Sequence, residues 1–325
     1  MNRRSAISSV MLTCLTVSAA YGEEPAVVAV VQDRDRLRIS VRGRPFADYV
    51  FRDAKLLRPY FANVHAPGGV QVTRHHPPRK GTDSTDHATM HPGIWLAFGD
   101  ISGADFWRNK ARVEHVKFVE KPTVGKDRLT FVVLNRYRRG VATICTEVCR
   151  HTLLIRPHGY LLTYDSKFRG EKPFTFGDQE ELGLGFRIAS KLRVKGGNGR
   201  IFNADGKKNE REVRGTNADW CDYGGTIDGK RAGIVLMPHP DNFRKSWYHA
   251  RNYGFLAANP FGRNALTGGE RSKVTVMPGS ALRLRFAVFI YAIADRKRLG
   301  VNRINAVYRD YLRQFPGNRS RKSMP

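Results

Sequence analysis

Short segments in which apolar and polar residues alternate recur along most of the chain. Arg36–Arg42 has an apolar residue at every second position, which is the period of a half-buried β-strand. Val113–Val119, Leu129–Tyr137 and Arg283–Phe289 alternate in the same way. Many such segments with few helical ones between them predict an all-β, mainly antiparallel protein. At this length, the expected architecture is a large two-sheet β-sandwich.

Turn-forming residues predict that neighbouring strands are joined as hairpins. Val141–Ile155 and Tyr160–Phe168 flank the sequence Pro157-His158-Gly159. Asp228-Gly229 lies between two further short apolar segments, and Asp-Gly in that position is a strong hairpin signal. Both pairs favour antiparallel neighbours in one sheet.

One segment has convincing helical spacing, at the C-terminal end of the chain. Asn302–Phe315 is followed at once by Pro316-Gly317, which ends a helix. No internal repeat or low-complexity linker divides the chain, so we predict a single domain over residues 23–315. The apolar residues at helical spacing are Ile304, Val307, Tyr308, Tyr311, Leu312 and Phe315.

The N-terminus has the three parts of a secretory signal peptide. Arg3 and Arg4 precede an uncharged apolar run, and the small residues of Ala20-Tyr21-Gly22 follow it. The run is shorter than the roughly 20 residues that a membrane span needs. We therefore predict a signal peptide over residues 1–22, cleavage near Gly22, a secreted or periplasmic protein, and no transmembrane anchor.

The cysteines do not form the pattern of a disulfide scaffold. Three cysteines follow the signal peptide, an odd number. Cys145 and Cys149 lie four apart in a predicted strand, where a rise of about 3.3 Å per residue separates them beyond the reach of a disulfide.

The chain is strongly basic. Its formal charge is +27, and removal of Arg3 and Arg4 with the signal peptide leaves +25. Such a charge attracts acidic polymers. Because no nucleic-acid-binding motif accompanies the charge and export removes the protein from the genome, we expect no specific nucleic-acid partner. Part of the excess lies near the C-terminus, where residues 316–325 are predicted to form a basic, frayed tail.

Aromatic, basic and histidine side chains are concentrated between Arg58 and Trp107. Five of the ten histidines lie between His65 and His91, among prolines and glycines that favour loops. A sugar site uses this mixture, because aromatic rings stack on apolar sugar faces while polar side chains hold the hydroxyls. We expect the substrate-binding residues of this segment to be Arg58, Arg74, Trp95 and Trp107.

Within that segment, Asp86-His87-x-x-x-His91 places a carboxylate beside two imidazoles. The pattern suits an acid–base pair, or a metal site if neutral imidazoles are ligands. It is also compatible with loop histidines that only satisfy backbone groups. His87 and His91 are the candidate catalytic residues, and no metal ligands are assigned.

Paired carboxylates form a second candidate cluster. Glu180 and Glu181 precede an apolar strand that ends at Arg187, and paired carboxylates are typical of glycoside chemistry. A salt bridge between loop and strand would explain them equally well. We predict Glu180 or Glu181 as catalytic base and Arg187 as a substrate-binding residue.

A third cluster lies between Asp219 and Gly262 and combines aromatic with polar side chains. Its large aromatics are as typical of a core as of a site. The candidate substrate-binding residues are Asp222, His239, His249 and Arg251.

These clusters, in this order, resemble a family of exported bacterial proteins that are often labelled methane oxygenase PmoA and have no assigned function. One departure is that Ala88, Thr89 and Met90 stand where the family usually has more histidines. Methane oxygenase activity is not expected, because such a subunit spans the membrane several times. The motifs that carry the resemblance are Arg58-Pro-Tyr, Val72-Thr-Arg74, Asp86-His87 with His91-x-Gly-x-Trp95, Gly99-Asp100 with Asp105-Phe-Trp107, Gln179-Glu-Glu181 with Gly183-x-Gly-x-Arg187, Trp220-Cys-Asp-Tyr-x-Gly225, His239-Pro-Asp-Asn-Phe-Arg244 and the stretch Trp247–Gly262.

The resemblance implies a sandwich similar to the galactose-mutarotase supersandwich, in which a histidine and a carboxylate act on a sugar. The leading hypothesis is an exported carbohydrate-active enzyme, a lyase, hydrolase or epimerase. The second is a β-sandwich that binds a carbohydrate or acidic polymer without catalysis. The third is an enzyme that depends on a divalent metal held by histidines, drawn from His65, His87, His91, His239 and His249.

Overall fold

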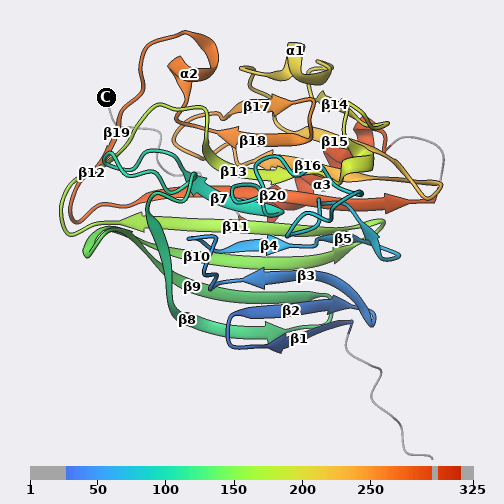
Figure 1. Cartoon of the computed structure of the whole chain (residues 1–325), viewed down its shortest axis with the longest axis horizontal. Helices are drawn as coiled ribbons and strands as arrows, with labels where there is room; N and C mark the ends of the chain where they lie inside the picture. The colour runs from blue at the N-terminus through green and yellow to red at the C-terminus, as the bar shows by residue number, and fades with distance from the viewer. Residues whose placement is uncertain (1–26, 295–298, 316–325) are drawn as a thin grey trace, which may run out of the picture.

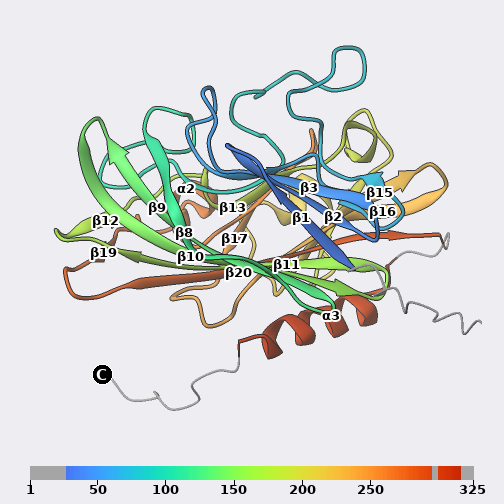
Figure 2. The same ribbon diagram turned by 90° about the horizontal axis from the view of Figure 1, so that it is seen from below.

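The computed structural model describes residues 27–294 and 299–315, which form two eight-stranded antiparallel sheets packed face to face (Figures 1 and 2). The predicted signal peptide and basic tail lie outside these residues. In spatial order, the first sheet contains β1 (Val28–Gln32), β2 (Arg36–Val41), β3 (Arg44–Val50), β4 (Tyr60–Ala62), β7 (Ile94–Phe98), β13 (Leu182–Arg187), β18 (Phe255–Asn259) and β17 (Trp247–Arg251).

The second sheet contains the longest strands, and the remaining elements are short apart from one helix. In spatial order, the second sheet contains β14 (Arg200–Asn203), β15 (Cys221–Ile227), β16 (Lys230–Pro238), β20 (Leu282–Ile293), β11 (Gly159–Arg169), β10 (Ala142–Arg156), β9 (Arg128–Arg139) and β8 (Arg112–Val124). The other elements are β5 (His65–Ala66), β6 (Val70–Gln71), β12 (Phe174–Phe176), β19 (Val274–Val276), the 3₁₀ helix Ser190–Leu192, α1 (Asn209–Val213), α2 (Arg263–Thr267) and α3 (Val301–Arg313).

The predicted strands and hairpins are present, and the all-β prediction is confirmed. The β10–β11 hairpin turns between Arg156 and Gly159, which pair with each other. The β15–β16 hairpin turns at Asp228-Gly229, where both residues have positive φ. Glycine adopts such a backbone conformation at no steric cost, which explains why Asp-Gly was an accurate signal.

The shared core lies between the sheets and is built by strand alternation. On β13, Leu182, Leu184 and Phe186 point into this core, and on β9 Leu129, Phe131 and Val133 do so from the other side. The intervening residues of the first sheet point outward, away from the second sheet. This parity decides which side chains of the first sheet are available to a site.

Helix α3 covers the outer face of the second sheet (Figure 2). Its buried residues Ile304, Tyr308 and Tyr311 belong to one cluster with side chains of β16 and β20. The predicted C-terminal helix is therefore confirmed, and the second sheet is covered on both faces over this region. Long loops lie on the opposite side of the molecule, over the outer face of the first sheet.

The described residues include the three cysteines that follow the predicted signal peptide. Cys145, Cys149 and Cys221 are buried and free, as expected from their spacing. No helix within 27–294 and 299–315 is both long enough and apolar enough to cross a membrane.

Candidate active site

Most of the predicted site residues meet on the outer face of the first sheet. Trp95 on β7, Arg187 on β13 and Phe255 on β18 alternate with core residues and point outward. Arg187 pairs in register with Phe255, which pairs with Arg251 on β17, so these three positions lie side by side across adjacent strands. A cluster of buried apolar residues covers the middle of this face; it comprises Val50, Leu56, Tyr60, Ala62, Trp95, Ala97, Trp107, Phe255 and Ala257.

Two predicted substrate-binding arginines hold the loops over this face. The Arg74 guanidinium is 1% exposed and donates to backbone carbonyls of the loop, at 2.6 Å to Asp86 and 3.2 Å to His91. Arg58 donates to the carbonyls of Met90 and Trp107, joining two loops. Burial lowers the pKa of Arg74 to about 10 and that of Arg58 to about 9. Because their donors are engaged by backbone carbonyls, both arginines position the site rather than reach a ligand.

His91 is the centre of an aromatic stack. Its ring stacks on Phe255 at 4.8 Å, on His87 at 4.9 Å and on Trp95 at 5.0 Å, and Trp107 meets it edge-on. The side chain is buried, which holds its pKa well below the usual value. A neutral, enclosed imidazole packs as an aromatic ring, so His91 supports the site from below.

His87 forms an exposed pair with Asp86. Its Nδ1 lies 2.8 Å from a carboxylate oxygen of Asp86, and its Nε2 has no partner among the described residues. His87 has a positive φ of 53°, a conformation that costs energy for a residue with a Cβ. Its ring stacks at 5.6 Å on Tyr253, which places the imidazole at the open edge of the aromatic stack.

Asp86 is itself fixed by cations and a hydroxyl. Arg187 donates to its carboxylate at 2.7 Å, and the hydroxyl of Ser84 donates to the same oxygen. Burial alone would raise the pKa of Asp86, but these donors, with His87, hold it well below its usual range. The carboxylate therefore stays ionised, and it fixes the orientation of His87 much as an acid orients a catalytic histidine.

Arg187 is fully buried beneath Tyr253. Its guanidinium lies 4.6 Å from the centre of the Tyr253 ring, a cation–π contact. Arg187 therefore contacts both the Asp86 carboxylate and the Tyr253 ring, on which His87 stacks.

Glu180 and His249 form a second histidine–carboxylate pair. His249 Nδ1 lies 3.2 Å from the Glu180 carbonyl oxygen, which makes Nδ1 the donor, and its Nε2 lies 3.3 Å from the Glu180 carboxylate. Nε2 makes no hydrogen bond among the described residues, so its contact with the carboxylate is a close approach of two titratable groups. Burial lowers the pKa of His249, while Glu180 favours its charged form. The pair is thus suited to give or take a proton, and Arg214 holds the other carboxylate oxygen.

Glu181 and Arg251 lie at the edges of the same face. Glu181 contacts Arg108, so its carboxylate is already paired with a cation. Arg251 lies 5.7 Å from the centre of the Tyr253 ring and 3.4 Å from Glu210.

The structure does not bring Asp222 and His239 to this face. Asp222 on β15 accepts a hydrogen bond from Tyr291 at 3.0 Å and lies within the second sheet, and burial raises its pKa to about 7. His239 packs edge-on against Tyr311 of α3. Both therefore lie on the side of the second sheet, away from His87.

The histidines proposed as metal ligands are dispersed. His65 is on β5 and His239 is beside α3, whereas His87 and His91 stack face to face. Among the described residues there is no group of three or more His, Cys, Asp or Glu side chains that could hold a metal ion.

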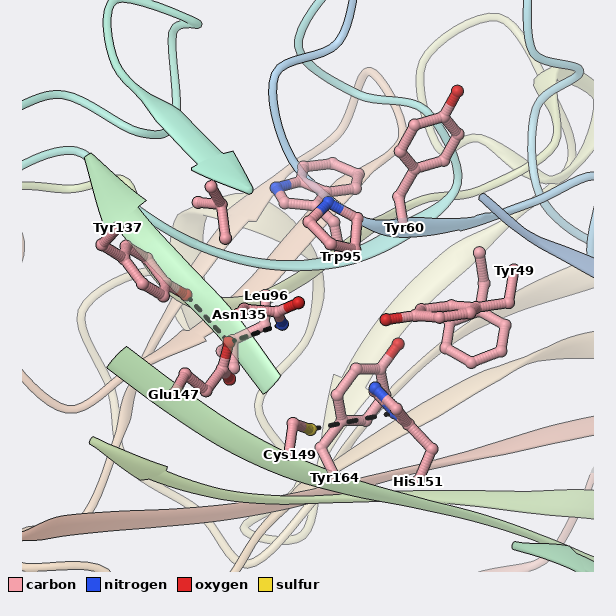
Figure 3. Close-up of a pocket in the computed structure, with 13 residues that line it drawn as sticks. Tyr49, Tyr60, Trp95, Leu96, Asn135, Tyr137, Glu147, Cys149, His151 and Tyr164 are labelled. Atoms are coloured by element: carbon pink, nitrogen blue, oxygen red, sulfur yellow. Dashed lines mark hydrogen bonds between the residues drawn. The ribbon is translucent and has the colours of Figure 1, made fainter. Parts of the chain in front are cut away.

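A polar cluster that the sequence reasoning missed lies between the sheets (Figure 3). Glu147 of β10 is buried without a cation and accepts hydrogen bonds from Asn135 at 3.0 Å, Tyr137 at 3.2 Å and Ser166 at 2.6 Å. Burial raises its pKa. His151 and Tyr164 line the adjoining cavity of about 20 Å³, the size of one water molecule. The signal available in the sequence was Glu147, a charged residue at a position of β10 where the alternation places core residues.

Tyr253 and Phe255 also lie at this face but were not among the predicted substrate-binding residues, although Tyr253 belongs to the third cluster. Phe255 alternates with the core residues Leu256 and Ala258 on β18, a pattern that a strand assignment there would have revealed. Tyr253 lies in the turn that precedes this strand.

Fold and site together define an all-β, two-sheet protein with two histidine–carboxylate pairs on the outer face of one sheet. A family model described as "Family of unknown function (DUF6807)" matches residues 36–302, and the chain belongs to this family. The methane oxygenase label is not part of that description and stays a resemblance. Among curated proteins, none matches the sequence.

Several solved structures are similar at low identity. The alpha-galactosidase from Lactobacillus brevis is 10% identical with a TM-score of 0.41, over 83% of this chain and 40% of that chain. The GH36 alpha-galactosidase AgaA from Geobacillus stearothermophilus has the same identity and TM-score, over 81% and 40%. A galactose mutarotase related enzyme from Lactobacillus acidophilus is 10% identical with a TM-score of 0.37, over 84% and 100%. The chain spans about two fifths of the length of the two galactosidases.

Proposed function

We propose that the protein is a carbohydrate-active enzyme that transfers protons on a bound sugar or glycoside. The observation that carries the proposal is the Asp86–His87 pair: a carboxylate fixed by Arg187 and Ser84 orients an exposed imidazole beside an aromatic ring. A histidine held in this way is a general acid–base group whose free Nε2 faces the substrate side. The aromatic and polar side chains around it suit a sugar.

The neighbouring residues have complementary roles. Tyr253 presents a half-buried ring on which an apolar sugar face stacks, and Arg251 beside it donates to hydroxyls. The Glu180–His249 pair supplies the second proton-transfer group, because it places an imidazole nitrogen 3.3 Å from a carboxylate. His91, Trp95 and Trp107 form the support beneath.

Epimerisation or elimination of a sugar fits these residues better than hydrolysis of a glycoside. Glycoside hydrolysis generally uses two carboxyl groups, one of them protonated. Glu180 and Glu181 are each paired with an arginine, Arg214 and Arg108 respectively, so neither carboxyl group is free to act alone. Two histidine–carboxylate pairs instead match proton removal and return at a sugar carbon.

We also propose that the protein acts outside the cytoplasm. This proposal is based on the predicted signal peptide. Expression of the full chain in a bacterial host, followed by N-terminal sequencing of the exported protein, tests it. The expected N-terminus is Glu23; an uncleaved chain retained in the cytoplasm would contradict the assignment.

The experiment for the enzymatic role is a substrate screen. The purified mature protein is incubated with a panel of glycosides and keto-sugars, with and without added divalent metal, and products are followed by NMR. Turnover that is independent of metal and lost in Glu180→Gln supports the proposal. Sugar binding without any turnover would favour the alternative of a non-catalytic carbohydrate-binding sandwich.

A further inference from the structure

We infer that the substrate is an oligosaccharide or polysaccharide, and that two connected grooves on the first sheet bind the units beyond the one at His87. This inference rests on the proposed sugar-binding function of the same sheet face. Apart from His65, which was considered as a metal ligand, no residue of these grooves was among the predicted site residues. The grooves lead from the candidate site across β4, β3 and β2 towards β1.

The first groove has a volume of about 400 Å³, which is in the range of small-molecule sites. Its floor is formed by Val50, Tyr60 and Ala62, which point outward from β3 and β4. One wall is the segment from Asp53 to Leu56, and the other combines His76–Pro78 with Ala88 and Thr89. Two prolines and the apolar floor, beside polar side chains, provide the apolar surface and the hydrogen-bonding rim that a pyranose needs.

The polar groups of this groove are held in place. The Tyr60 hydroxyl donates to the Asp53 carboxylate, and the His76 ring packs edge-on against Tyr60 at 5.2 Å. Burial by itself raises the pKa of Asp53, but Tyr60 and two backbone amides hold it below the usual value. Burial lowers the pKa of His76 to about 4, so its imidazole is neutral at pH 7. An ionised carboxylate and a neutral imidazole accept and donate hydrogen bonds to hydroxyl groups.

The groove is continuous with the candidate site. Ala88 and Thr89 in its wall follow His87 directly in the chain. Tyr60 in its floor belongs to the same apolar cluster as Trp95 and Trp107. A sugar chain with one unit at His87 therefore has its next unit over Tyr60.

A second groove continues in the same direction. It has a volume of about 460 Å³ and is lined by Arg38, Ser40 and Asp48 of β2 and β3. Asn63 lines both grooves, so the two meet at its side chain. Together they give a path longer than one sugar unit.

The grooves carry charges of both signs. Arg36 is paired with Asp35 at 2.8 Å and lies 3.8 Å from Asp48, and Arg38 is paired with Asp33 at 2.8 Å. Although the chain as a whole is strongly basic, these guanidinium groups are already engaged with carboxylates. Lys55 in the first groove and Arg79 in the second are exposed and form no ion pair among the described residues, so both grooves offer basic donors as well as carboxylate acceptors to sugar hydroxyls.

The test measures binding against chain length. Calorimetric titration of the mature protein uses cello-, xylo-, manno- and malto-oligosaccharides of one to four units. On the ladder that binds, the affinity is expected to rise roughly tenfold between one and three units. Thr89→Trp, which fills the first groove from an exposed position, is expected to remove this rise and leave the one-unit affinity within about twofold. Thr85→Trp is the matched control, since Thr85 is exposed in the same loop but does not line the groove.

The outcomes separate the inference from the proposed function. Absence of length dependence on every ladder, or equal affinities in wild type and Thr89→Trp, overturns the grooves as subsites and leaves the site at His87 untouched. Length-dependent binding that Thr89→Trp abolishes, without turnover of any sugar, supports the grooves and contradicts the proposed catalysis.

Discussion

At the scale of single residues, the candidate site depends on the carboxylate of Asp86. It joins the buried Arg187 to the exposed His87, with contacts of 2.7 Å and 2.8 Å. Loss of its charge leaves Arg187, which is fully buried, without its counter-ion. Such a loss is costly because a buried charge cannot recover its hydration.

Asp86→Asn is therefore expected to affect both activity and stability. We expect a fall in turnover of roughly 100-fold and a loss of about 1–3 kcal/mol of unfolding free energy at pH 7. Because the folded-state pKa of Asp86 is depressed, its contribution is present above the unfolded pKa of about 3.9 and is lost as pH falls below it. Urea unfolding at pH 7 and at pH 3 checks this. A difference between variant and wild type that is the same at both values would contradict the ion pair.

The sequence identified which residues gather at the site better than what each of them does. His87, Glu180 and Arg187, which lie on one face in the structure, stood out because polar residues in loops and strand ends are conspicuous among apolar segments. The role of Arg58 and Arg74 was missed, since hydrogen bonds to backbone carbonyls leave no pattern in the sequence. Asp222 was grouped with the site because its neighbours are aromatic, yet its strand belongs to the other sheet.

At the scale of elements, the strands were predictable because each has one face in the shared core. Alternation of apolar and polar residues predicted β2, β9 and β20, and turn-forming residues predicted two hairpins. The order of the strands was not predictable: β13 lies between β7 and β18, which are far apart in the sequence. Long-range pairing of this kind depends on packing between complementary faces, which single segments do not encode.

Strand β10 places the carboxyl group of Glu147 in the apolar core, and this makes the free energy of unfolding depend on pH. The folded-state pKa of Glu147 is raised by burial, so its contribution is largest below the unfolded value and is lost as pH rises. Glu147→Gln keeps the shape without the charge. We expect similar unfolding free energies at pH 5 and an advantage of about 1–2 kcal/mol for the variant at pH 8.5. Equal stabilities of variant and wild type at both pH values would show that ionisation of Glu147 does not destabilise the folded state.

Helix α3 is bound to the second sheet through its apolar face. Ile304 is buried in the cluster with β16 and β20, whereas Val301 is exposed in the same helix. Ile304→Ala is expected to cost about 2–4 kcal/mol of unfolding free energy, through lost burial and the cavity left behind. Val301→Ala is the control and is expected to change stability by less than about 0.5 kcal/mol. Chemical denaturation measures both; a small effect of Ile304→Ala would mean that α3 is not part of the cooperative fold.

At the scale of the whole molecule, buried histidines outnumber buried carboxyl groups with raised pKa values. Burial lowers the pKa of His115 and His239 to about 4 and of His151 to about 3. The unfolded chain therefore binds more protons than the folded chain between about pH 6.5 and pH 4. Glu147 and Asp222 act in the opposite sense over part of this range but are fewer.

Stability is accordingly expected to decrease as pH falls from 7 to 4. The sign follows because histidines with depressed folded-state pKa values stabilise the fold above their unfolded pKa and lose that contribution below it. Urea midpoints at pH 7.5, 6 and 4.5 should fall in that order. A midpoint that stays constant or rises towards pH 4.5 would contradict the burial of these imidazoles in the folded protein.

The central claim, that the Asp86–His87 pair performs acid–base chemistry on a sugar, is tested most directly by a pair of histidine variants. His87→Gln removes the imidazole of the candidate site. His75→Gln is the matched control, because His75 forms a similar pair with Asp83, at 2.7 Å, in the same loop. On the sugar identified in the substrate screen, His87→Gln is predicted to lower kcat by roughly 100- to 10,000-fold, and His75→Gln to leave it within about twofold. Full turnover by a folded His87→Gln variant would contradict the account.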